Sequence, residues 1–401
     1  MYTLLMSSDY ERSEWKEAIL TAKRECRVTP SLTPYHIEKL LTKCKRGRKI
    51  NNIGSILIKD EEELLFGTLH VTVHQAKGLT VPAQLYCCVE VDSYGIISLR
   101  ARTRKSENSK TPTWDQEFGL EVEGAHTLRI LCYDYTKGLE DEMIDKGAKT
   151  LTRSEIGKKE ISTTIKMEKL EIDIGLRFES TEKALKRVQS KKKLGVFGVR
   201  ISNLCNREGS KIPNIVKLCV EEVEKRGISE MGIYRISGSS ADIQKLKKLF
   251  EMNSKHIPTK LKQAEIHAVA GLIKHYFREL PEPLFTQNLY SKFLDGIALT
   301  DPDAKREMMI SVLKSVPEPN KTNIFYIFNH LKRVAENESI NKMHLHNLAT
   351  VFGPTLIGPA SKAVTGGSGS PMSGLLGMSD AMTQVGILYY FLEHYSSNDG
   401  S

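Results

Sequence analysis

The chain has 401 residues, of which 40% are hydrophobic and 27% charged, as in an ordinary water-soluble protein of two or three domains. No run approaches the roughly 18 consecutive apolar residues of a membrane-spanning helix, and the first residues lack the layout of a secretory signal. Seven scattered cysteines without C-x-x-C spacing argue against disulfides and zinc, and predict reduced thiols in a cytoplasmic protein.

The net charge of +9 favours an acidic partner, such as anionic lipid, nucleic acid or an acidic protein surface. Basic residues gather in two clusters, at 43–49 and at 183–193. Each cluster is open to two interpretations, a contact with an anionic membrane or a solvated linker. Nucleic acid is the least favoured partner, because no aromatic side chains are interleaved with the basic ones as single-strand binding requires.

Residues 1–26 predict a short strand followed by a helix, with Asp9 at the N-cap and Trp15 on the apolar face. This pair resembles the last two elements of a pleckstrin-homology domain. One strand and one helix cannot bury a core of their own. We therefore interpret 1–26 as the C-terminal remnant of such a domain, without its phosphoinositide site, and 27–63 as a linker.

Residues 64–180 show the two-residue alternation of β-strands, for example at Leu69, Val71 and Val73. Several such runs, separated by turn residues, predict an antiparallel β-sandwich. The segment 112–118 has the spacing Pro-x-Trp-x-x-x-Phe, which resembles the signature of C2 domains. The resemblance implies that 64–180 is a C2 domain.

Calcium sites of C2 domains need several aspartates on two loops, because calcium takes six to eight hard oxygen ligands. Here the loop 80–84 has no carboxylate, and Thr136 stands where an aspartate is expected to follow Asp134. The acidic residues at 140–145 are interpreted as part of an insertion, with a displaced calcium site as the less favoured alternative. We therefore expect no metal. Four basic residues are candidates to face lipid, with a protein partner or a solvated strand face as alternatives: Arg100, Arg102, Arg104 and Lys105.

After a basic linker at 181–194, the chain changes to helical periodicity and predicts an all-α domain over 195–396. The apolar stripes lie at 212–226, 264–277, 288–297, 303–316, 321–335 and 382–394. A segment rich in glycine and serine, 363–377, is predicted to be a loop before the last helix.

Three segments of this helical part follow one another in a characteristic order. They are Met-Gly-Ile-Tyr-Arg-Ile-Ser-Gly at 231–238, Lys-His-Tyr-Phe-Arg-Glu-Leu-Pro-Glu-Pro-Leu at 274–284 and Asn-Leu-Ala-Thr-Val-Phe-Gly-Pro at 347–354. Together they resemble the GTPase-activating (RhoGAP) domain of Rho-family regulators. The resemblance implies that Arg235 is an arginine finger, on a loop before a helix that Ser239 is predicted to cap.

Physical chemistry supports an arginine in that role. Phosphoryl transfer spreads negative charge over oxygens, and a planar, permanently charged guanidinium can contact two of them at once, which lysine cannot. Taken alone, the Gly-x-Tyr-Arg string would indicate one more surface arginine, and the ordered set of three segments favours the finger. In the resembled family, residues at the positions of Lys274 and Asn347 contact the GTPase, and the one at Arg278 braces the finger loop. Thr355 stands where the family often has asparagine, which puts one secondary contact in doubt.

The order of these modules resembles the breakpoint cluster region family. The resemblance implies an activator of GTP hydrolysis by Rac and Cdc42, and not an enzyme in itself. No cofactor is expected on this chain, because GTP and magnesium belong to the partner. Two alternatives stay open, a non-catalytic GTPase-binding adaptor and a membrane-surface scaffold. The expected location is the cytoplasm, with peripheral association at the plasma membrane.

Overall fold

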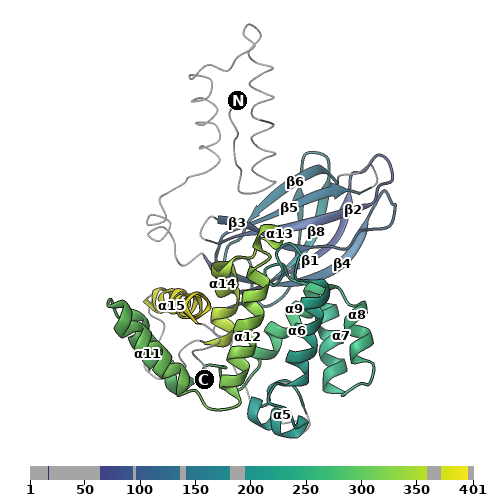
Figure 1. The fold of residues 1–401 in the computed structure, drawn as a ribbon. Helices are drawn as coiled ribbons and strands as arrows, with labels where there is room; N and C mark the ends of the chain where they lie inside the picture. Colours follow the sequence, from purple (N-terminus) through teal and green to yellow (C-terminus); the bar gives the residue numbers. More distant parts are fainter. Residues whose placement is uncertain are drawn as a thin grey trace. The chain divides into compact units, whose positions relative to one another are not determined.

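The computed structural model describes residues 64–93, 96–135, 141–180, 195–358 and 372–395, together with the single residue Glu17. The chain divides into two compact units, a β unit up to Thr181 and a helical unit from Glu182 onward (Figure 1). The predicted pleckstrin-homology remnant, apart from Glu17, and the two predicted linkers lie outside the described residues. The predicted boundaries, 64–180 and 195–396, stay predictions.

The β unit is a sandwich of two four-stranded sheets (Figure 1). The first sheet has the order β4 (Thr113–Ala125), β1 (Leu65–Lys77), β8 (Glu171–Ser180), β7 (Ile161–Lys166). The second has the order β3 (Ile96–Arg102), β2 (Leu85–Ser93), β5 (Thr127–Asp134), β6 (Glu142–Thr150). The pairs β1–β8, β7–β8, β2–β3, β2–β5 and β5–β6 are antiparallel.

The alternating residues of β1 explain why this segment forms a strand in a sandwich. Leu69, Val71 and Val73 point to one side and are fully buried. Trp114 and Phe118, the aromatic residues of the C2-like signature, are also buried. Because successive side chains of a strand point to opposite faces, this pattern places one face of the sheet in the core. The predicted antiparallel sandwich is confirmed.

The structure corrects the prediction of an insertion around 140–145, because residues 142–145 lie in β6 and pair with β5. Strand periodicity is hidden there, since the buried positions of β6 are Asp145 and Gly147 and not apolar residues. The Asp145 carboxylate accepts hydrogen bonds from the backbone N–H groups of Lys169 and Leu170, both at 2.7 Å. This acid therefore holds the turn between β7 and β8.

The helical unit confirms the predicted all-α domain (Figure 1). Its helices are α5 (Ile201–Glu208), α6 (Asn214–Arg226), α7 (Ser240–Glu251), α8 (Ile257–Gln263), α9 (Ile266–Arg278), η1 (Gln287–Leu289), α10 (Tyr290–Ala298), α11 (Pro302–Lys314), α12 (Asn320–Ala335), α13 (Glu338–Asn341), α14 (Leu345–Leu356) and α15 (Met372–His394). Their apolar faces form one large core.

The last helix begins earlier than predicted. Residues 372–377 belong to α15, although the sequence predicted a loop through 377. Glycine lowers helix stability by about 1 kcal/mol relative to alanine but does not end a helix as proline does. Pro371, directly before the helix, is the last proline of the chain. Among the described helices, none combines the length and the apolar character needed to cross a membrane.

Candidate functional site

The finger loop, residues 227–239, joins α6 to α7 and carries Arg235. Its turn is closed by hydrogen bonds from the N–H groups of Arg235 and Ile236 to the carbonyl of Gly232, at 2.9 and 2.8 Å. Gly232 has φ +68° and Tyr234 has φ +70°. Glycine adopts this left-handed region easily, but at tyrosine it costs on the order of 1–3 kcal/mol and persists only where the surroundings hold it.

The side chain of Arg235 is half-buried, and its sequence neighbours Ile233, Tyr234 and Ile236 are buried. Its Nε is buried, and within the described part of the chain no hydrogen bond or ion pair reaches this side chain. Burial lowers the pKa of Arg235 from its ordinary value, although arginine stays protonated near neutral pH. Arg235 is therefore a partly desolvated cation, and none of the described residues places an anion beside it.

The finger loop is attached to the scaffold at its centre by Asn341, a residue that no sequence motif singles out. The carbonyl of Asn341 accepts the N–H of Gly232 at 2.7 Å. The buried Asn341 side chain donates to the carbonyls of Ile228 and Val334 and accepts the N–H of Met343, each at 2.8 Å. A single buried polar residue at the end of the four-residue helix α13 has no periodic signal, so only the fold identifies it.

The end of the finger loop lies against the first turn of α9. A Cβ atom on Gly238 would lie 2.5 Å from the Cα of Ala268 and 2.7 Å from the carbonyl carbon of His267. The Glu265 carboxylate begins α9 by accepting the N–H groups of His267 and Ala268 at 2.9 and 3.0 Å. At the same end of the loop, Ser239 is the N-cap of α7 as predicted, but its side chain makes no capping hydrogen bond.

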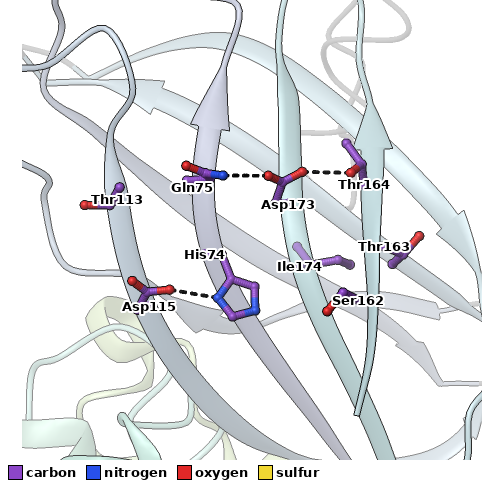
Figure 2. A pocket seen from close by; sticks show the side chains of 9 residues that line it. All are labelled: His74, Gln75, Thr113, Asp115, Ser162, Thr163, Thr164, Asp173 and Ile174. Atoms are coloured by element: carbon purple, nitrogen blue, oxygen red, sulfur yellow. Dashed lines mark hydrogen bonds and ion pairs between the residues drawn. The ribbon is translucent and has the colours of Figure 1, made fainter.

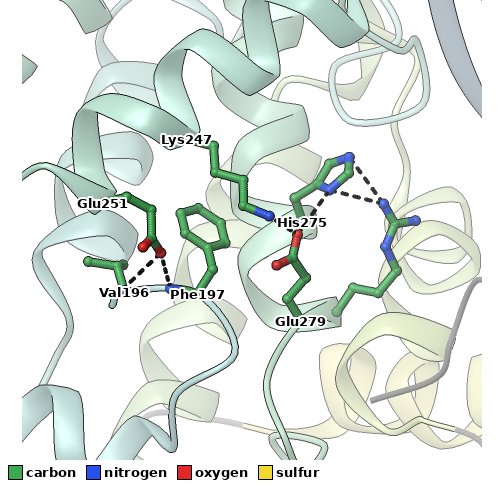
Figure 3. A network of polar contacts seen from close by, with 7 residues as sticks. Val196, Phe197, Lys247, Glu251, His275 and Glu279 are labelled. Atoms are coloured by element: carbon green, nitrogen blue, oxygen red, sulfur yellow. Dashed lines mark hydrogen bonds and ion pairs between the residues drawn. The ribbon is translucent and has the colours of Figure 1, made fainter. Parts of the chain in front are cut away.

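Lys274 and Arg278 both lie on α9, four residues apart and half-buried. The Arg278 guanidinium lies 3.1 Å from Nε2 of His275. The His275 ring is 3.9 Å from the Glu279 carboxylate, which accepts a hydrogen bond from Lys247 at 2.5 Å (Figure 3). The implied bracing of the finger loop by Arg278 stays a prediction.

This network concentrates charge at the end of α9. Burial by itself raises the pKa of Glu279, but hydrogen bonds to His275 and Lys247 outweigh burial and lower the pKa below its ordinary value. Glu279 is therefore ionised at neutral pH. It supplies the negative charge that the cluster of cations on α7 and α9 requires.

Asn347 lies in the first turn of α14, where its side-chain amide donates to the carbonyl of Lys342 at 3.1 Å. The same helix contacts the finger loop through Phe352, whose ring meets Tyr234 edge-on with centroids 4.8 Å apart. The structure thus places the finger loop against both α9 and α14. These two helices carry Lys274, Arg278 and Asn347.

The candidate lipid-facing residues lie along one edge of the second sheet of the β unit. Arg100 and Arg102 are on the edge strand β3, and Arg104 and Lys105 follow it. Arg104 donates to the carbonyl of Trp114 at 3.1 Å. The Lys105 ammonium lies over the ring of Tyr135. All but the half-buried Arg100 are exposed.

A pocket of about 480 Å³ lies on the first sheet of the β unit (Figure 2). Its polar groups already bind one another. His74 contacts Asp115 at 2.8 Å, and Asp173 accepts from Gln75 at 2.8 Å and from Thr164 at 2.7 Å. Hydrogen bonds from Lys77, Thr164 and Gln75 lower the pKa of Asp173 to about 2. These contacts stabilise the sheet. The carboxylate of Asp173 is already satisfied by hydrogen bonds from side chains of the sheet, so it does not indicate a ligand site.

No group of three or more histidine, cysteine, aspartate or glutamate side chains in the described ranges is arranged to hold a metal ion. Asp134, the acid expected nearest to a calcium loop, is buried. The expectation that this chain carries no cofactor stays a prediction.

The sequence matches the family models of the C2 domain at residues 67–165 and of the RhoGAP domain at 213–361. It is 45% identical to the active breakpoint cluster region-related protein of Xenopus laevis, over 98% of this chain and 47% of that protein. It is 43% identical to the breakpoint cluster region protein of Mus musculus, over 98% of this chain and 32% of that protein. The chain thus spans less than half the length of either relative.

The crystal structure of human Rho GTPase activating protein 15 is 34% identical and covers 51% of this chain and 92% of its own, with a TM-score of 0.44. Each motif that suggested a module from sequence falls within or beside the matched range of that module. The Pro-x-Trp-x-x-x-Phe segment lies in the C2 match, and Arg235, Lys274, Arg278 and Asn347 lie in the RhoGAP match. The chain therefore carries a C2 domain followed by a RhoGAP domain, and it is similar over 98% of its length to these breakpoint cluster region proteins.

Proposed function

We propose that this chain accelerates GTP hydrolysis by Rho-family small GTPases, with Rac and Cdc42 as the targets, by inserting Arg235 into the partner's active site. The observation that carries the proposal is the half-buried Arg235 side chain, held on a tight loop without a partner in the described part of the chain. A loop that is already ordered loses little conformational freedom when it docks. The guanidinium then meets an anion, which none of its described neighbours supplies.

In this mechanism the GTPase supplies the nucleotide, the magnesium ion and the group that orients water. Arg235 neutralises charge that develops on the phosphoryl oxygens, a contribution of roughly 10³–10⁵ in rate for an arginine supplied in trans. Lys274 and Asn347 contact the GTPase beside the finger, and Arg278 braces the finger loop. The chain changes the rate of another protein's reaction and has no substrate of its own.

A panel of GTP-loaded Rac, Cdc42 and Rho tests this function by single-turnover phosphate release with and without the chain. We expect release from Rac and Cdc42 to accelerate by about 10³-fold or more, and release from Rho to change far less. Tight binding to the GTP-loaded GTPases without faster release would instead support the adaptor. Equal acceleration of all three would contradict the proposed preference.

A second role, peripheral association with an anionic membrane, is favoured by two exposed apolar side chains of the β unit. Val81 is 61% exposed and Tyr135 is 45% exposed. Their loops are joined by a hydrogen bond from the N–H of Tyr135 to the carbonyl of Gln84, at 2.9 Å. Lys105 lies over the Tyr135 ring. Apolar side chains beside basic ones are suited to the boundary between lipid headgroups and acyl chains.

Vesicle sedimentation tests the membrane role. We expect binding to phosphatidylserine vesicles without calcium, and a loss of about 10²-fold or more in affinity when Val81→Ser and Tyr135→Ser are combined, since each apolar side chain contributes about 1.5–3 kcal/mol when fully inserted and about 1.4 kcal/mol is tenfold in affinity. Met252→Ser is the matched control, because Met252 is 77% exposed but belongs to the helical unit. Unchanged binding of the double variant would rule out insertion at these loops.

A further inference from the structure

Tyr234 directly precedes the finger, and its buried hydroxyl begins a hydrogen-bond network that reaches the partly exposed Glu224 and Arg333 and that the proposed reaction does not use. Its side chain is 0% exposed, and its hydroxyl lies 2.5 Å from Nε2 of His330. His330, on α12, is also 0% exposed, and its Nδ1 lies 2.7 Å from the carboxylate of Glu224 on α6. Arg333 closes the network with hydrogen bonds to the same carboxylate oxygen at 2.9 and 2.5 Å.

The protonation states in this hydrogen-bond network follow from which groups can donate a proton and which can only accept one. Burial lowers the pKa of His330, so its ring is neutral at physiological pH. The hydrogen bond with His330, together with Arg333, lowers the pKa of Glu224, so its carboxylate is ionised and only accepts. Nδ1 of His330 therefore donates to Glu224, which leaves Nε2 to accept the hydroxyl proton of Tyr234. Every group then has a complementary partner.

We propose that this hydrogen-bond network positions Arg235, with Tyr234 as the positioning residue and with His330 and Glu224 holding Tyr234. The inference rests on the proposed GTPase-activating function. The backbone of Tyr234 is at φ +70°, a conformation that the surroundings must hold. The ring is already packed against Phe352. The hydroxyl adds a directional bond to α12, which sets the rotation of the ring and, through the shared peptide, the direction in which Arg235 leaves the loop.

Tyr234→Phe removes only the hydroxyl and tests the inference. We expect the hydrolysis rate at saturating activator to fall about tenfold, because an unmet buried acceptor and a slightly displaced loop act together. The affinity for the GTP-loaded GTPase is expected to stay within about twofold, since Lys274 and Asn347 are untouched. Tyr276→Phe is the matched control. Tyr276 is equally buried, and no hydrogen-bond partner of its hydroxyl is found among the described residues.

A double-mutant cycle with Arg235→Ala separates positioning from a general structural role. If Tyr234 acts through the finger, Tyr234→Phe lowers the rate of the intact protein but not the residual rate of the Arg235→Ala variant. Additive losses in the two backgrounds, or a loss equal to that of Tyr276→Phe, would overturn the inference.

Amide hydrogen exchange gives a readout that needs no GTPase. Amides 232–236 are expected to exchange faster in Tyr234→Phe than in Tyr276→Phe, because the loop opens more often without its tie to α12. Unchanged exchange in Tyr234→Phe would refute the positioning role even if the chain activates GTPases. Faster exchange in a protein that activates no GTPase would refute the proposed function instead, so the two failures are distinguishable.

Discussion

Replacing Arg235 by alanine is expected to lower stimulated GTP hydrolysis by about 10³-fold or more, nearly to the GTPase's own rate. The reason is electrostatic. The half-buried guanidinium has no anion near it within the described part of the chain, and it gains one only when phosphoryl charge develops in the partner. The interaction is strongest in the transition state, so its loss lowers the rate and not the affinity. Single-turnover phosphate release at saturating activator measures it.

Two further variants separate the geometry of the finger from binding of the GTPase. Arg235→Lys keeps the charge but loses the fork that contacts two oxygens, so we expect little recovery of the rate. Lys274→Ala should behave in the opposite way, with weaker binding to the GTP-loaded GTPase and a smaller change in the saturated rate. Binding is measured on the GTP-loaded complex. A rate that survives in Arg235→Ala would remove the arginine finger from the mechanism.

Replacing Gly238 by alanine is expected to damage both stability and activity. The new methyl group would lie 2.5 Å from the Cα of Ala268 and 2.7 Å from the carbonyl carbon of His267, and these backbone atoms belong to a capped helix start. Overpacking of this kind costs about 1–3 kcal/mol. Relief requires the finger loop to move away from α9, and a displacement of about 1 Å can lower a rate by about 10²-fold.

Gly386→Ala is the matched control for Gly238→Ala. Gly386 lies inside α15, and a Cβ atom there would meet nothing within 4 Å. Alanine in a helix interior is favoured over glycine by about 1 kcal/mol, so this variant should be as stable as the parent or more so, with an unchanged rate. Thermal unfolding and phosphate release on both variants give the comparison. A Gly238→Ala protein as stable and as active as the parent would show that the loop tolerates separation from α9.

Much of the architecture was readable from periodicity. The alternation of Leu69, Val71 and Val73 predicted a sandwich strand because burial on one face leaves a two-residue repeat. The same logic failed for β6, where Asp145 and Gly147 occupy the buried positions and cross-strand pairing with β5 supplies the order. It also failed at the start of α15, where Ser373, Gly374 and Gly377 interrupt the apolar residues of the helix.

The sequence by itself determined which residues are candidates for the site, because Arg235, Lys274, Arg278 and Asn347 stand in short segments whose order and spacing are visible in the chain. Only the tertiary structure decided how Arg235 is held. Asn341 and His330 lie far along the chain from the finger loop. The carbonyl of Asn341 nevertheless accepts the N–H of Gly232, and the ring of His330 forms a hydrogen bond with the hydroxyl of Tyr234. Hydrogen bonds between distant segments leave no local repeat in a sequence, since they depend on where packing brings each backbone and ring.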